Sequence, residues 1–226
     1  MLAKIRDHLF IVNGLINDVV NGTAPETNLQ IGDISQCFDS MWLKETLNDM
    51  YNAGINNDCL ALLYETNKKC HISVKTPVGL TNRREINEVV MQGGIFGGLQ
   101  CALQTDLLGK DCLETGEGTF QYKKSLHIPP LGYIDDYIGA TKCDTDSIKL
   151  NVKTEETMKA KKLKLNEDKC HVMHIGKTKS CPPLKINNKD MKDVDHEKYL
   201  GQYISSNGKN DKNINDRYNK GIGISC

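Results

Sequence analysis

The sequence predicts an α+β fold in which an antiparallel sheet has helices packed on one face. Apolar runs at 128–131 and 137–140 flank Asp135 and Asp136, a pattern typical of two strands of a hairpin with the acids at its tip. Upstream, alternating residues run as a strand into Asp33, and apolar residues then recur at helical spacing. Strands joined by hairpins and interleaved with helices favour an antiparallel sheet backed by helices.

The remaining elements follow from periodicity and turn signals along the chain. The tripeptide at 77–79 and the pair Asn207 and Gly208 mark tight turns, and Thr145 or Ser147 can open the long helix after the acidic hairpin. A chain of 226 residues can bury a sizeable core. We expect helices at about 4–20, 36–53, 57–67, 99–114 and 146–163, and further strands at about 70–75, 80–90, 170–175, 184–187 and 198–204.

The adjacent carboxylates of Asp135 and Asp136 suggest a divalent metal site. Two carboxylates held together at a turn repel each other unless a cation lies between them. The alternative is an ordinary polar turn, because aspartate is a common turn residue. Asp33 favours the metal hypothesis, since a carboxylate at the end of a neighbouring strand can reach the same ion. Between these acids lies a glycine-rich turn at 92–100, which opens another apolar helix.

These three blocks, in this order and at this spacing, resemble the palm of a reverse transcriptase, most closely that of non-LTR retrotransposons. The resemblance continues through 162–170, which resembles the fourth block of the family, and through 198–201, which matches its primer-grip turn. It implies a reverse-transcriptase palm at 29–205. It also implies a remnant of the connection between fingers and palm at 1–28 and the start of a thumb at 206–226, with truncation at both ends.

The resemblance implies an RNA-directed DNA polymerase, which adds deoxynucleotides to a primer 3′-hydroxyl on an RNA or DNA template during retrotransposition. Its cofactors would be two Mg²⁺ or Mn²⁺ ions, which activate the attacking oxygen and neutralise the leaving group. By the same resemblance, Asp33 bridges both ions, Asp135 is the second carboxylate ligand, and Asp136 is a weaker one. The main-chain oxygen of Ile34 is a further expected ligand.

Further roles carry over position by position. Phe38 would lie against the sugar of the incoming nucleotide, although a core aromatic on the first turn of a helix is the alternative. Lys169 would act as the general acid that protonates the leaving pyrophosphate, or else it is a solvated lysine in a basic stretch. The resemblance also assigns nucleotide and template contacts to Gln92 and Gly93, and the primer grip to Tyr199, Leu200 and Gly201.

Composition predicts a nuclear or cytoplasmic protein with no membrane or disulfide partner, whereas an RNA template and a DNA primer are partners that the resemblance implies. Nine cysteines, an odd number, are scattered without the pattern of a disulfide framework. No segment has the ~18 consecutive apolar residues that a membrane span needs, and the N-terminus lacks the apolar core of a signal peptide.

Charge is divided unevenly along the chain. The formal net charge is +0, but residues 1–150 carry 13 basic and 19 acidic side chains, while residues 151–226 carry 16 basic and 10 acidic ones. The first part is therefore acidic by 6 charges and the second basic by 6. The lysines at 159, 161, 162 and 164 could hold a primer–template backbone, or they form a solvated helix face.

Several alternative functions are open to the same residues. The glycines at 93–98 lack the Gly-Lys-Ser/Thr that completes a P-loop. Cys170, His171, His174 and Cys181 are zinc-type ligands without regular spacing, and a packed strand is the alternative. The chain could also be a catalytically inactive retrotransposon remnant that lacks fingers and thumb, at most a weak nucleic-acid binder. An unrelated Mg²⁺-dependent phosphotransfer enzyme could share the acidic turns, but it would not need the other blocks.

Overall fold

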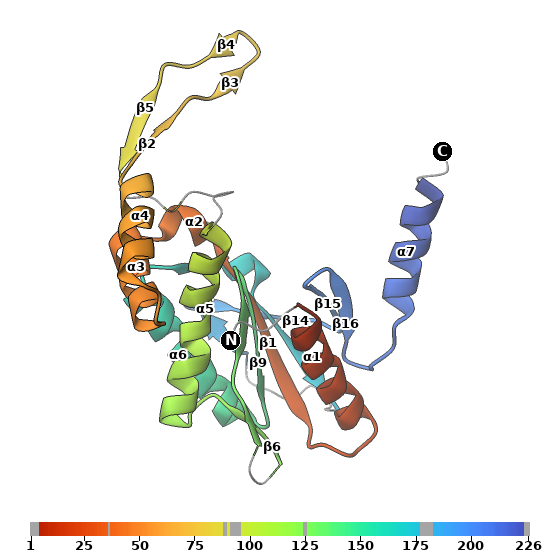
Figure 1. Cartoon of the computed structure of the whole chain (residues 1–226). Coiled ribbons are helices and arrows are strands. Elements are labelled where there is room, and N and C mark those ends of the chain that lie inside the picture. The colour runs from red at the N-terminus through yellow and green to blue at the C-terminus, as the bar shows by residue number, and fades with distance from the viewer. Residues whose placement is uncertain are drawn as a thin grey trace.

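The computed structural model describes residues 5–35, 37–87, 90, 96–123, 126–176 and 183–223. Its centre is a six-stranded sheet with the order β14-β11-β1-β9-β8, and β10 pairs with the end of β1 (Figure 1). The pairings are antiparallel apart from β11 with β14, which is parallel. The strands are β1 Thr27–Ser35, β8 Leu131–Tyr133, β9 Asp136–Thr141, β10 Lys164–Leu165, β11 His171–Ile175 and β14 Lys192–Asp193. The predicted antiparallel sheet is therefore confirmed.

Two long helices cover one face of this sheet, α5 Gly97–Thr115 and α6 Asp144–Ala160. Glycines let them approach closely, because a Cβ on Gly132 would lie 2.9 Å from Thr105 of α5, and one on Gly139 would lie 2.5 Å from Leu150 of α6. Helix α1 Ile5–Val20 lies across the opposite face, so helices are not confined to one face.

Apolar and polar side chains alternate along the central strand β1, because its two faces contact different elements. Leu29 and Ile31 pack in the core cluster that contains the apolar residues of α1. Asn28 and Gln30 face α6 instead, where their side-chain amides donate to the hydroxyl and the carbonyl of Ser147 at 3.0 and 2.6 Å. The buried side-chain amides of Asn28 and Gln30 are thus hydrogen-bonded through their N–H groups.

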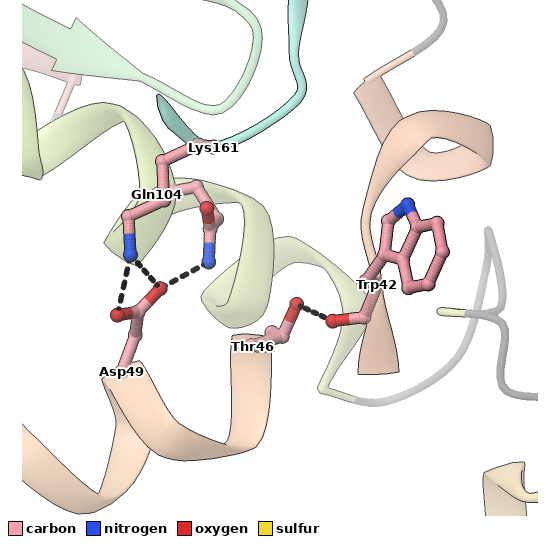
Figure 2. A network of polar contacts seen from close by, with 5 residues as sticks. All are labelled: Trp42, Thr46, Asp49, Gln104 and Lys161. Carbon is pink, nitrogen blue, oxygen red and sulfur yellow. Dashed lines mark hydrogen bonds and ion pairs between the residues drawn. The ribbon is translucent and has the colours of Figure 1, made fainter. Parts of the chain in front are cut away.

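The segment after β1 forms a separate group of short helices. The expected single helix at 36–53 is wrong, because the chain is extended at Trp42 (φ −90°, ψ 124°) while Met41 turns into the core. A hydrogen bond of 2.9 Å from the hydroxyl of Thr46 to the carbonyl of Trp42 closes the first turn of the second helix (Figure 2). The helices are α2 Cys37–Ser40, α3 Leu43–Asn52 and α4 Asn57–Asn67, the last as predicted.

A long β arm projects from the end of α4 and stands clear of the sheet (Figure 1). It consists of β2 Lys69–Ile72 paired with β5 Arg84–Asn87, and of β3 Lys75–Thr76 paired with β4 Gly79–Leu80. The predicted hairpin is thereby confirmed. We call α2, α3, α4 and this arm the helical lobe.

Smaller elements complete the structure. Pro129 and Pro130 belong to no strand, so β7 ends at Ile128, β8 begins at Leu131, and the expected strand at 128–131 is displaced. Helix α7 Asp211–Gly223 was not predicted and stands apart from the sheet (Figure 1). The other elements are β6 Phe120–Lys123 with β7 Leu126–Ile128, η1 Glu167–Lys169, β12 Lys185–Ile186 with β13 Lys189–Asp190, and β15 His196–Tyr199 with β16 Gln202–Ser205.

Two expectations from composition have different outcomes. Within the residues that the structure describes, no helix is both long and apolar enough to span a membrane. The expected absence of a disulfide is not met, because Cys37 of α2 and Cys101 of α5 are joined, with their Cα atoms 6.9 Å apart. Cysteine spacing in the sequence carries no signal for a pair that only tertiary packing brings together.

Candidate active site

Three carboxylates from distant parts of the chain meet at one end of the sheet. Asp33 of β1 stands directly opposite Asp136, the first residue of β9. Asp135 lies in the two-residue turn between Tyr133 and Asp136, which are themselves paired. The backbone N–H of Ile34 donates to the carbonyl of Asp135 at 2.7 Å and ties this turn to β1. The acidic hairpin and the acidic strand end therefore form one cluster, as the sequence predicts.

The turn that presents Asp135 has an unusual backbone. Ile134 has φ 58°, which is rare and costly for a β-branched residue. Its carbonyl lies 3.3 Å from the Sγ of Cys101, and its side chain packs against the core. Such conformations persist only where the surroundings enforce them, and they cluster at functional sites.

The buried aromatic ring of Tyr137 packs against β1 beside the acidic residues. Gly32 is paired with Tyr137, and a Cβ on Gly32 would lie only 2.2 Å from that ring. The ring of Tyr137 thus lies against the backbone of β1, next to both Asp33 and Asp136. Glycine is needed here because any side chain would displace the ring.

The carboxylates interact electrostatically. Burial, together with the negative charges of Asp135 and Asp33, raises the pKa of Asp136 from 3.8 to about 6. A cation placed among these groups would reverse that shift, since an opposite charge favours the ionised form. The carboxylates of Asp135 and Asp33 thus add to the effect of burial in disfavouring a third negative charge at Asp136.

One positive charge is supplied by the protein itself. The ammonium of Lys169, on η1, lies 3.1 and 3.2 Å from the two carboxylate oxygens of Asp33. The hydrogen bond to Asp33 raises the pKa of Lys169, so the amine keeps its proton firmly. Asn166 also belongs to the site, because its backbone N–H donates to the carbonyl of Asp33 at 2.8 Å. The sequence did not assign it a role there. Both predicted roles of Lys169 stay open, since its side chain is paired yet largely exposed.

The donor set fits a hard divalent cation, which prefers carboxylate oxygens. Two adjacent strands bring Asp33, Asp135 and Asp136 together, and the lysine neutralises only part of their charge. As they stand, no three His, Cys, Asp or Glu side chains of the described residues form a ready metal cage. The ligand assignments, including the main-chain oxygen of Ile34, remain predictions.

The expected nucleotide contacts are only partly visible. Phe38 lies on α2, a few residues after Asp33, and is half-buried against a core cluster that includes Ile34. It therefore has both a core-facing and an exposed part, and neither of its two predicted roles is excluded. Gln92 and Gly93 lie outside the described residues.

The predicted primer-grip turn forms the tip of the β15–β16 hairpin. Leu200 and Gly201, with φ of 47° and 81°, make a two-residue turn between the paired Tyr199 and Gln202. Two positive φ values in a row are typical of tight hairpins. The buried hydroxyl of Tyr199 lies 3.1 Å from Nδ1 of His8 on α1, a contact for which the sequence carries no local signal.

The zinc alternative finds no support among the described residues. The ring of His171 is hydrogen-bonded to Glu197, and Nδ1 of His174 lies 2.8 Å from the side-chain oxygen of Asn28. Burial raises the pKa of the Cys170 thiol to about 11, which opposes the thiolate form that zinc needs. Cys181 lies outside the described residues. A packed strand explains 171–175 better than a zinc site.

An antiparallel palm-like sheet with clustered carboxylates defines a class of nucleotide polymerase, and sequence comparison agrees. The family described as reverse transcriptase (RNA-dependent DNA polymerase) matches residues 5–204, and the chain belongs to this family. A search of curated proteins found no match.

Solved structures show the same fold. Apo telomerase from Candida tropicalis, solved without its C-terminal domain, matches this chain with a TM-score of 0.61 and 14% sequence identity. The match covers 92% of this chain and 39% of that chain. Telomerase from Candida albicans in complex with a fragment of telomeric RNA has a TM-score of 0.54 and 11% identity, over 92% of this chain and 36% of that one. The chain thus spans less than half the length of these neighbours.

Proposed function

We propose that this chain is the catalytic core of an RNA-directed DNA polymerase from a non-LTR retrotransposon, working in the nucleus or cytoplasm. It would add deoxynucleotides to a primer 3′-hydroxyl on an RNA or DNA template during retrotransposition. The observation that carries the proposal is the cross-strand pairing of Asp33 with Asp136, beside Asp135 in the adjoining turn, in a chain of the reverse transcriptase family.

The reaction is an in-line displacement at phosphorus. The primer 3′ oxygen forms a bond to the α-phosphorus of the nucleotide, and the bond from that phosphorus to pyrophosphate breaks. Asp33, Asp135 and Asp136 would hold two Mg²⁺ or Mn²⁺ ions, with Ile34 adding a main-chain oxygen. When bound, the ions activate the attacking oxygen and neutralise the leaving group.

The other residues would bind and orient the substrates. The ring of Phe38 would exclude a 2′-hydroxyl by steric contact and so favour deoxynucleotides. Lys169, which lies beside Asp33 and is protonated there, would pass a proton to the departing pyrophosphate. The turn of Leu200 and Gly201 would contact the primer strand.

Nucleic-acid partners are supported by the structural neighbours as well as by the family. The Candida tropicalis telomerase was solved with a fragment of telomeric RNA, with a TM-score of 0.62 and 14% identity over 93% of this chain and 34% of that chain. We infer an RNA template and a DNA primer for this chain from the reaction class.

The test is Mg²⁺- or Mn²⁺-dependent incorporation of a deoxynucleotide on a primed RNA template. We expect wild type to incorporate, and Asp33→Asn and Asp135→Asn to lose the activity by at least about a hundredfold, because each removes a metal ligand. Asp190→Asn, on the exposed β12–β13 hairpin, is the matched control and should keep it. A folded wild type that never incorporates, or an Asp135→Asn variant as active as wild type, would contradict the proposal.

A further inference from the structure

The helical lobe is joined to the rest of the molecule mainly through α5. Helices α2 and α3 pack against α5, while the outer part of the lobe is exposed. Of the large apolar residues of α4, Leu63 is buried and Leu62 is 61% exposed, and Val78 at the arm tip is 98% exposed. Leu43 and Met50 of α3 are fully buried, but apolar burial is non-directional and does not by itself define the angle of the lobe on the sheet.

A buried charge lies in that contact surface. The carboxylate of Asp49 on α3 accepts two hydrogen bonds from the ammonium of Lys161, at 2.8 and 2.9 Å, and a further one from the side-chain amide of Gln104 (Figure 2). The side chain of Asp49 is only 9% exposed and that of Lys161 25%. The three residues belong to α3, to α5 and to the turn after α6, so one carboxylate joins the lobe to both helices behind the sheet.

A second ion pair on the same two segments provides a natural comparison. Glu45, one helical turn before Asp49, is 3.1 Å from the ammonium of Lys162, but the two side chains are 39% and 51% exposed. Ion pairs in water contribute little, whereas removal of one partner from a buried pair leaves an uncompensated charge. Asp49 should therefore control the lobe and Glu45 should not.

We propose that Asp49 is a positioning residue, which fixes the angle of the helical lobe on the sheet through Lys161 and Gln104. Its consequence for catalysis rests on the proposed polymerase function. Phe38 is carried on α2, which leads through Met41 and Trp42 directly into α3. A lobe that tilts at α3 displaces Phe38 relative to Asp33, so nucleotide binding and sugar selection change before the chemistry does.

The first test measures the lobe without any need for activity. Amide hydrogen exchange is followed in the intact chain under reducing conditions, so that the bond between Cys37 and Cys101 does not hold the lobe in place. In Asp49→Asn we expect amides of α3 and α4 to exchange about tenfold faster or more, while those of β1 and β9 keep their protection. Glu45→Gln should exchange like wild type.

A double variant separates the ion pair from a general loss of stability. Lys161→Met tests the same contact from its more exposed side, and in combination with Asp49→Asn it should exchange no faster than the worse single variant, because neither charge is then left alone. The proposal is overturned if Asp49→Asn and Lys161→Met both exchange like wild type in α3 and α4. It is equally overturned if Glu45→Gln opens the lobe as much as they do.

The second test reads out function. Under the same reducing conditions, we expect the KM for the deoxynucleotide to rise about tenfold in Asp49→Asn with a smaller change in kcat, and the preference for deoxynucleotides over ribonucleotides to fall. If kcat falls while the KM and the preference for deoxynucleotides stay unchanged, the inference that Asp49 acts through Phe38 is overturned. If wild type shows no incorporation, the polymerase proposal fails, while hydrogen exchange still decides whether Asp49 anchors the lobe.

Discussion

The acidity of Asp136 is set by its surroundings. Its pKa is raised to about 6 by burial and by Asp135 and Asp33, so the folded protein holds a proton between about pH 4 and pH 6 that the unfolded chain has released. A state that binds more protons when folded loses stability as the pH rises. We therefore expect the free energy of unfolding of the metal-free protein to fall as the pH rises through this window.

This expectation is checked by urea unfolding in the presence of a chelator between pH 4 and pH 7. Asp136→Asn should abolish that part of the fall, because the residue can no longer bind the proton. The pKa of Asp168 is shifted in the opposite direction, because its hydrogen bond to Lys189 lowers it. Asp168→Asn should therefore leave the fall in stability in place. An Asp136→Asn variant with the same pH dependence as wild type would contradict the assignment.

Gly32 is the residue whose replacement the site tolerates least. A Cβ there would lie 2.2 Å from the buried ring of Tyr137, and a packed core has no space into which that ring can move. We expect Gly32→Ala to lower the free energy of unfolding by about 1–3 kcal/mol or more, as measured by urea denaturation.

A second glycine provides the control for this measurement. Gly14 lies in the middle of α1, and a Cβ on it would meet no atom of the described residues within 4 Å. Gly14→Ala should therefore stabilise the protein by about 0.5–1 kcal/mol, because alanine loses less conformational freedom in a helix. If both replacements have the same effect, the ring of Tyr137 is not what requires Gly32.

At the scale of elements, α1 and the β15–β16 hairpin are joined by a buried polar contact. Burial lowers the pKa of His8 and raises that of Tyr199, so a neutral imidazole can accept from a protonated hydroxyl. The ring of His8 also meets that of Tyr133, next to the acidic turn, edge-on at 5.9 Å. His8 thereby contacts both the hairpin of Asp135 and Asp136 and the β15–β16 hairpin.

Tyr199→Phe tests this contact. It leaves the buried imidazole of His8 without its hydrogen-bond partner, and we expect a loss of about 1–3 kcal/mol in the free energy of unfolding. Tyr203→Phe, on the other strand of the same hairpin, should change it by no more than about 0.5 kcal/mol. Equal losses in the two variants, measured by urea denaturation, would show that the contact with His8 contributes nothing.

For the molecule as a whole, the basic C-terminal part is less available to a nucleic acid than its charge suggests. Lys161 is committed to Asp49, and Lys162 contacts both Glu45 and the ring of Trp42. Lys159 and Lys164 line an open cavity of about 720 Å³ together with Lys162 and Lys185, and no ion pair of Lys159 or Lys164 is seen among the described residues. The lysine run that the sequence presents as one basic stretch thus has at least two structural uses.

Salt dependence of RNA binding distinguishes these uses. If Lys159 and Lys164 contact phosphates, replacing either by glutamine should make the negative slope of log K for RNA binding against log salt shallower by about 0.7–1. Lys189→Gln removes a lysine that is already paired with Asp168 at 2.7 Å, and it should leave the slope nearly unchanged. Unchanged slopes in all three variants would place the RNA elsewhere on the molecule.

Local sequence pattern was sufficient wherever neighbours in the chain decide the structure. The strand into Asp33, the helix at 57–67 and the hairpin that carries Asp135 and Asp136 all have periodicity or turn chemistry of their own. The strand expected at 198–204 is interrupted by the turn of Leu200 and Gly201, which only the resemblance to the family indicated. The order of these blocks also sufficed for the family, because spacing along the chain needs no coordinates.

Contacts between distant segments were decided only by tertiary structure. The pairing of Asp33 with Asp136, the ring of Tyr137 on Gly32, the bonds from Lys161 to Asp49 and the contact of His8 with Tyr199 join residues that lie about 100 or more positions apart. Hydrophobic burial is non-directional, so the sequence determined which side chains must be buried or charged. Close packing in three dimensions determined which of them meet, and therefore which lysine anchors the lobe and which carboxylates share a site.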